Sequence, residues 1–210
     1  MAVLAARFLD PKHGKRLEKA AYDLTLALKT GGVWEIPEEY PLETLASERE
    51  AGSLFGRLSF RWEVRKLTPK TFSVSGNAST TMEIYDLGGS SAPLLSWNTD
   101  IGGPGHPGYR FHVQFRSNQK SVEIPRLPSI LLTPVDCLDF LLGELFQGEW
   151  TKHQYESRLQ TAGWIQGVRT RVCHILRTKA DCAAQSQGIT PWMTLKSWNL
   201  KKPRLTFCDD

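Results

Sequence analysis

The first periodic stretch of the chain places apolar residues at the three- to four-residue spacing of an amphipathic helix. Asp10 and Pro11 precede this stretch. The pair favours a helix start, because an Asp side chain caps free backbone N–H groups and a proline in the first turn needs no N–H. Gly31 follows the stretch and favours a helix end. The pattern predicts a helix over residues 11–29 with one buried face.

The hydrophobic period then changes to two. Leu58, Phe60 and Trp62 alternate with polar or charged residues, as in a strand with one buried face. The alternation recurs several times, and it is interrupted by Gly, Pro, Asn and Ser residues that favour turns. We expect an antiparallel meander of about four strands between residues 57 and 116. The preceding residues 34–56, with two prolines and a cluster of glutamates, are interpreted as a connecting segment.

Helical periodicity returns after a proline-rich connector. Thr133, followed by Pro and an acidic residue, is a capping-box start, and a broad apolar arc predicts a deeply buried helix over residues 134–147. A second capping pattern at Thr151 predicts another helix start. The apolar stripe changes phase near Gly163, which predicts a break and a last helix over residues 164–180.

These elements predict an α+β fold. We expect residues 1–210 to form a single α+β domain, with an antiparallel β-meander of about four strands packed against an N-terminal helix and two to three C-terminal helices, mainly on one sheet face. Residues 188–210 are expected to form a basic, Trp-containing C-terminal tail. No stretch approaches the ~20 apolar residues of a membrane span, and the apolar start is too short for a secretory signal. We therefore expect a cytoplasmic protein without a membrane partner, with its four cysteines as reduced thiols.

The charge of the chain is unevenly distributed. The net charge is +4, but residues 1–150 hold 16 basic against 18 acidic residues, whereas residues 151–210 hold 10 against 4. The basic excess therefore lies in the last part of the chain. Such an excess favours an anionic partner, either nucleic acid or an acidic protein.

Arginines also occupy the polar positions of the predicted strands, and arginine binds phosphate and carboxylate in a bidentate manner. A solvated sheet face is the alternative interpretation, because an exposed strand face needs polar residues in any case. The basic-face hypothesis predicts sequence-tolerant, salt-dependent binding. The predicted nucleic-acid or anion-binding residues are Arg57, Arg61, Arg65, Arg110, His112, Arg116, Arg169, Arg171, Arg177, Lys201, Lys202 and Arg204.

Two cysteines are candidates for a catalytic nucleophile. Cys137 falls in the first turn of a predicted helix, where the helix dipole lowers a thiol pKa, although a small core residue is the alternative. Cys173 falls on the polar side of its helix with Arg169 and Arg177 one turn away, an arrangement that favours a thiolate. Only Cys173 is expected to react readily with a thiol reagent. The sequence predicts no metal site and no cofactor, because no set of His and Cys residues has ligand spacing.

The order of helix, meander, proline-rich connector and helices resembles in outline the ubiquitin-conjugating enzyme family and its non-catalytic relatives. The marker of that family is His-Pro-Asn followed closely by the catalytic cysteine. Here His106 and Pro107 continue to Gly108, and the next cysteine, Cys137, lies inside a predicted helix. The resemblance implies a cysteine-dependent transfer reaction. The glycine-rich residues 102–108 lead into a strand and are interpreted as an inter-strand loop.

Three functions follow from these observations. The first is a non-enzymatic binding or adaptor protein that contacts nucleic acid or an acidic protein partner through a basic face. The second is a cysteine-dependent transfer enzyme with a ubiquitin-conjugating-like outline. The third is a structural subunit of a larger protein complex, anchored by Trp192, Trp198 and the basic tail. The sequence leaves the oligomeric state open.

Overall fold

A computed structural model gives the structure of the chain. All statements below concern the residues that it describes. These are residues 2–49, 52–68, 71–74, 78–89, 91–101, 111–116, 127–128, 132–157, 162–170, 172–173 and 205–206.

The described strands form one antiparallel sheet of nine strands in the order β8-β7-β6-β5-β3-β4-β9, with β1 and β2 also paired to β3. The α+β class is therefore confirmed, but the expected number of about four strands is wrong. The strands are β1 (Val33–Glu43), β2 (Ser47–Arg49), β3 (Gly52–Thr68), β4 (Thr71–Val74), β5 (Ser79–Asp86), β6 (Leu95–Ile101), β7 (Phe111–Arg116), β8 (Leu127–Pro128) and β9 (Leu205–Thr206).

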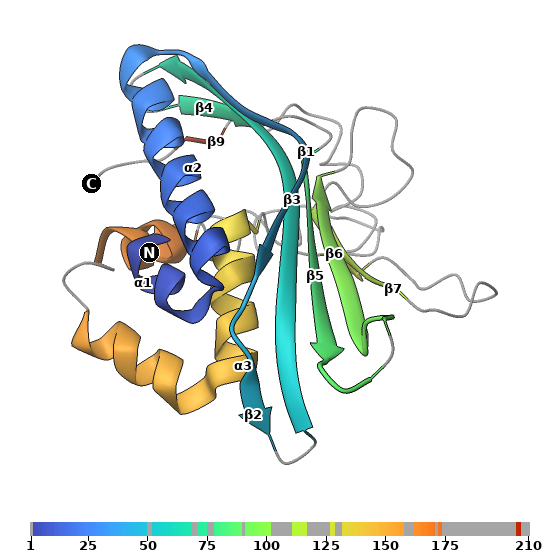
Figure 1. Cartoon of the computed structure of the whole chain (residues 1–210). Helices are drawn as coiled ribbons and strands as arrows, with labels where there is room; N and C mark the ends of the chain where they lie inside the picture. Colours follow the sequence, from blue (N-terminus) through green and yellow to red (C-terminus); the bar gives the residue numbers. More distant parts are fainter. Residues whose placement is uncertain are drawn as a thin grey trace, which may run out of the picture.

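The helices lie on one side of the sheet (Figure 1). They are α1 (Ala2–Ala5), the 3-10 helix η1 (Ala6–Phe8), α2 (Pro11–Thr30) and α3 (Pro134–Glu156), and residues 162–170 are also helical. The Asp10 side chain accepts a hydrogen bond from the Lys12 backbone N–H, and Gly31 ends α2 at φ 77°. Both predicted signals of this helix are confirmed. Among the described residues, no helix combines the length and the apolar character needed to cross a membrane.

Strand β1 corrects the prediction of a connecting segment over residues 34–56. Among the described strands, β1 pairs only with β3 and is therefore an edge strand. Edge strands tolerate proline, so the two prolines of β1 are compatible with a strand. A register shift between Ile36 and Tyr40 interrupts the period of two, which hides the strand in the sequence. At its end, the Asp10 N–H donates to the Glu43 carbonyl oxygen at 3.0 Å.

The hydrophobic core lies between the sheet and the helices, and α3 packs over β3 and β5. The close approach of α3 to β3 depends on Gly56, since a Cβ at this position would lie 2.7 Å from Leu145 Cδ1 and 3.0 Å from Leu141 Cδ1. Leu141 and Leu145 are buried, as the apolar arc of the sequence predicts. The central side chains of the core are Leu42, Leu58, Phe60, Trp62, Met82, Leu138, Leu141, Leu142, Leu145 and Trp150.

Helix α3 is kinked at Gln147, which has φ 38° and ψ −110°. The predicted end of this helix near residue 147 corresponds to the kink. A second helical segment follows the kink, as predicted, but it begins before Thr151. Thr151 does not cap its start, because the Thr151 hydroxyl donates to the Gln147 carbonyl oxygen at 3.1 Å. Of the predicted last helix, residues 164–170 and 172–173 are helical, and residues 174–180 lie outside the described part of the chain.

Candidate binding groove

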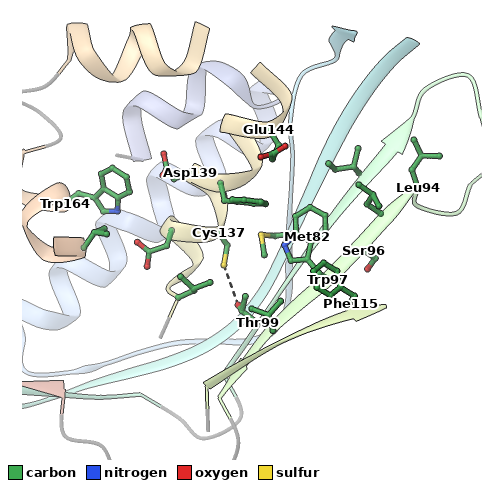
Figure 2. A pocket seen from close by; sticks show the side chains of 17 residues that line it. Met82, Leu94, Ser96, Trp97, Thr99, Phe115, Cys137, Asp139, Glu144 and Trp164 are labelled. Atoms are coloured by element: carbon green, nitrogen blue, oxygen red, sulfur yellow. Dashed lines mark hydrogen bonds between the residues drawn. The ribbon is translucent and has the colours of Figure 1, made fainter. Parts of the chain in front are cut away.

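A groove with a volume of about 770 Å³ opens between α3 and the sheet, and most of its walls are apolar. Figure 2 shows it extending from Trp164 at one end to Leu94 at the other. Its described lining consists of Met82, Ile84, Leu94, Leu95, Ser96, Trp97, Thr99, Val113, Phe115, Leu132, Asp136, Cys137, Asp139, Phe140, Glu144, Trp164 and Val168.

Strand register builds the sheet wall of the groove. Met82 on β5 is paired with Trp97 on β6, and Trp97 is paired with Phe115 on β7. Paired residues of neighbouring antiparallel strands point to the same face, so these side chains form a row across three strands. The Trp97 ring contacts the Phe140 ring of α3 edge-on, with their centroids 5.8 Å apart, and joins the two walls.

The outer part of this wall is exposed although it is apolar. Leu95 is 58% exposed, and Leu94, Phe115 and Phe140 are exposed to a similar extent. These side chains adjoin the buried core instead of standing singly on the surface. A contiguous exposed apolar patch of this kind is typical of an interaction site.

The charged residues of the described lining are all acidic, and all come from α3: Asp136, Asp139 and Glu144. The Asp136 carboxylate accepts hydrogen bonds from the Thr133 backbone N–H and hydroxyl as part of the capping box. Burial raises the pKa of Asp139, and hydrogen bonds from Trp150 Nε1, at 2.9 Å, and from Gln154 act in the opposite direction. Glu144 is exposed at the rim. The α3 side of the groove is therefore the side that favours positive charge.

Cys137 lies at the base of the groove, with Sγ 3.5 Å from the Thr99 hydroxyl oxygen. Burial raises the pKa of this thiol to about 12, so it stays protonated at neutral pH. A protonated, buried thiol is a poor nucleophile. The interpretation of Cys137 as a small core residue is therefore favoured over a catalytic role, whereas Cys173 is exposed.

Thiol labelling is expected to separate these two cysteines. In the native protein at neutral pH, iodoacetamide should modify Cys173 and leave Cys137 unmodified, because only Cys173 is accessible. Peptide mass spectrometry after timed quenching measures both sites in one sample. In urea, Cys137 should label as fast as an ordinary thiol. Native labelling of Cys137 at the rate of Cys173 would contradict its buried position.

The predicted basic face is partly neutralised by its neighbours. Arg57 Nη2 lies 2.7 Å from Glu43 Oε1, and its guanidinium stands over the Tyr85 ring. Arg65 lies 3.8 Å from Glu63 on the same strand. Arg57 is therefore engaged in an ion pair within the protein, and the contact of Arg65 is longer and more exposed.

His112 departs from the expectation that it faces solvent. It is 3% exposed, and its Nε2 lies 3.6 Å from Asp100 Oδ2 on the neighbouring strand β6. Arg61 and Arg169 are exposed, as expected. For Arg116 only the backbone in β7 is described. The predicted residues outside the described part are Arg110, Arg171, Arg177, Lys201, Lys202 and Arg204, together with the loop at 102–108.

The groove itself is absent from the sequence-based candidates. One signal was available, since Phe140 is a large apolar residue outside the apolar arc of its helix. Among the residues that the structure describes, no group of three or more His, Cys, Asp and Glu side chains could hold a metal ion. Comparisons of the chain with protein-family models, with curated proteins and with solved structures give no match.

Proposed function

We propose that this chain is a non-enzymatic binding protein that holds an apolar part of a partner protein in the groove between α3 and the β5–β6–β7 face. The observation that carries the proposal is the group of half-exposed apolar side chains in the groove, which adjoin the buried core: Leu94, Leu95, Phe115 and Phe140. Covering such a group removes apolar surface from water, at about 25 cal/mol for each Å².

Two properties of the groove support a protein partner over a substrate. Its volume falls within the ~300–1,000 Å³ of ligand sites, but its half-exposed wall contrasts with the enclosure of a small-molecule pocket. Its described lining contains no histidine, the side chain that most often serves as a general base, and its one cysteine thiol is protonated. Its Asp139 carboxylate, which is partly buried, already accepts hydrogen bonds from Trp150 and Gln154. Both properties agree with a protein that binds a partner without catalysing a reaction.

An uncharged apolar dye tests the proposal. N-phenyl-1-naphthylamine becomes fluorescent in apolar surroundings, and we expect saturable binding to the native protein. Leu95→Gln should weaken dye binding about fivefold, because it places an amide in the apolar wall. Leu67→Gln is the matched control. Leu67 also lies on a strand and is 54% exposed against 58% for Leu95, but it is outside the described groove lining.

The difference in dye affinity between these two variants tests the proposal. Equal dye affinity in Leu95→Gln and Leu67→Gln would place the dye elsewhere and contradict the proposal, as would the absence of saturable binding by the wild-type protein. Circular dichroism of both variants verifies that each one is folded.

The second candidate function is the predicted binding of nucleic acid or an acidic protein through the basic sheet face. Exposed Arg61 and Arg65 on β3 favour it, since alternation along the strand places them opposite to buried Phe60 and Trp62. The Glu63 neighbour of Arg65 and the Glu43 partner of Arg57 reduce the available charge. Binding through this face would weaken steeply with added salt, whereas dye binding in the apolar groove would not.

A further inference from the structure

Helix α3 covers only part of the sheet face on its side. It packs over β3 and β5 and reaches Trp97 of β6 through Phe140, whereas Leu95 of β6 and Phe115 of β7 are about half exposed. The exposed strip therefore spans two strands only at one end of β6, where Leu95 lies near Phe115 of β7, because Trp97 and Thr99 farther along β6 are buried. Strands in a sheet lie about 4.8 Å apart, so two strands occupy roughly 10 Å.

This width matches one helix. An α-helix with its side chains has a diameter of about 10–12 Å, and packed helices lie about 8–10 Å apart. A helix laid beside α3 would cover the exposed strip, contact Leu95 and Phe115 with its apolar face, and contact Phe140 with its flank. An added strand would instead bind at a sheet edge and leave this face exposed.

The charge on the α3 side selects the kind of helix. Asp139 and Glu144 are on the wall that would flank the added helix, and the described lining contains no basic residue. Figure 2 shows Glu144 along the upper rim of the groove and Asp139 between it and Trp164. Burial already disfavours ionisation of Asp139, so a cation brought beside it would stabilise the carboxylate.

We infer that the occupant of the groove is an amphipathic helix of a partner protein with basic side chains along the edge that faces α3, seated over β6 and β7. The inference rests on the proposed function, since it requires that the groove bind an apolar partner. Apolar contacts to the sheet supply most of the affinity, and the carboxylates on α3 set the orientation and the preference for a basic helix.

Displacement of the neutral dye by three model peptides tests the inference. Each has about 18 residues, roughly five helical turns, with Leu at helical spacing. The polar positions hold Lys in the first peptide, Glu in the second and Gln in the third. We expect the Lys peptide to bind about tenfold more tightly than the Glu peptide, with the Gln peptide between them. The net charge of +4 would by itself favour the Glu peptide, so a preference for Lys reports the local charge of the groove.

Two further comparisons measure how much the helical conformation of the peptide and the Glu144 carboxylate each contribute to peptide affinity. A Lys peptide with proline at its centre cannot continue a helix and should bind at least about tenfold more weakly. Glu144→Gln should lower affinity for the Lys peptide about threefold relative to any change in affinity for the neutral dye, because the dye carries no charge for the carboxylate to attract. Glu149→Gln is the matched control, because Glu149 is also an exposed glutamate of α3 but is outside the described lining, and it should change neither affinity.

The outcomes separate the inference from the function on which it rests. Dye binding without displacement by any helical peptide, or equal affinity for the Lys and Glu peptides, would overturn the inference and leave the apolar groove in place. Equal affinity for the helical and proline-containing Lys peptides would overturn its helical part. Absence of dye binding to the wild-type protein would overturn the proposed function itself.

Discussion

Replacing Leu141 by alanine is expected to lower the free energy of unfolding by about 3 kcal/mol, within the ~2–5 kcal/mol typical of buried leucines. Leu141 is 0% exposed and packs against Gly56 of β3. Truncation removes apolar contacts and leaves a cavity that a long strand and a helix cannot readily close. Urea unfolding followed by circular dichroism measures the loss.

The neighbouring residue Phe140 provides the control. It is 51% exposed and contributes an edge-on contact to Trp97, so Phe140→Ala should cost only about 1 kcal/mol. The same variant removes part of the groove wall and should weaken dye binding, whereas Leu141→Ala should not do so beyond its effect on folding. Equal destabilisation by the two variants would contradict the division of α3 into a core side and a groove side.

Gly56→Ala is expected to destabilise the protein by about 2 kcal/mol, although the added side chain is a single methyl group. The new Cβ would lie 2.7 Å from Leu145 Cδ1 and 3.0 Å from two atoms of Leu141. Both leucines are buried in the core and have little space to rotate away, so α3 has to move from the sheet. Thermal and urea unfolding both report the change.

Gly143→Ala tests whether this effect depends on position. Gly143 lies inside α3, and the nearest neighbour of an added Cβ is Trp150 Cδ1 at 3.9 Å, an ordinary contact. Because alanine favours the helix and restricts the unfolded chain, this variant should raise the free energy of unfolding by about 0.5–1 kcal/mol. Destabilisation by both variants would show that the close approach at Gly56 is not the cause.

Local signals made α2 predictable from the sequence. The Asp10 cap, the following proline and Gly31 act within one turn of the helix ends, so no distant contact has to be known. Strand β1 depends on distant contacts. Its prolines are acceptable because it pairs with β3 on one side, and its register shift between Ile36 and Tyr40 is defined only by its pairing with β3. Neither fact can be read from the segment itself.

The groove was hidden from the sequence for a related reason. Alternation assigns side chains to two faces of a sheet, but it does not tell which part of a face a helix will cover. Leu95 and Phe115 have the same pattern as buried Leu58 and Phe60, yet they lie beyond α3. His112 shows the opposite case, a residue at a predicted solvent-facing position that is buried beside Asp100.

The edge formed by β1 offers few free backbone donors to a strand of a second molecule. Pro37 and Pro41 have no N–H to offer an incoming strand, and the end of β1 is already bonded to the N-terminal segment through Asp10 and Leu45. A second molecule therefore finds no continuous ladder of donors there, and growth of a shared sheet into β-linked polymers is disfavoured at this edge. The closed edge matters in a protein with an exposed apolar groove, since exposed apolar surface and a free strand edge together promote aggregation.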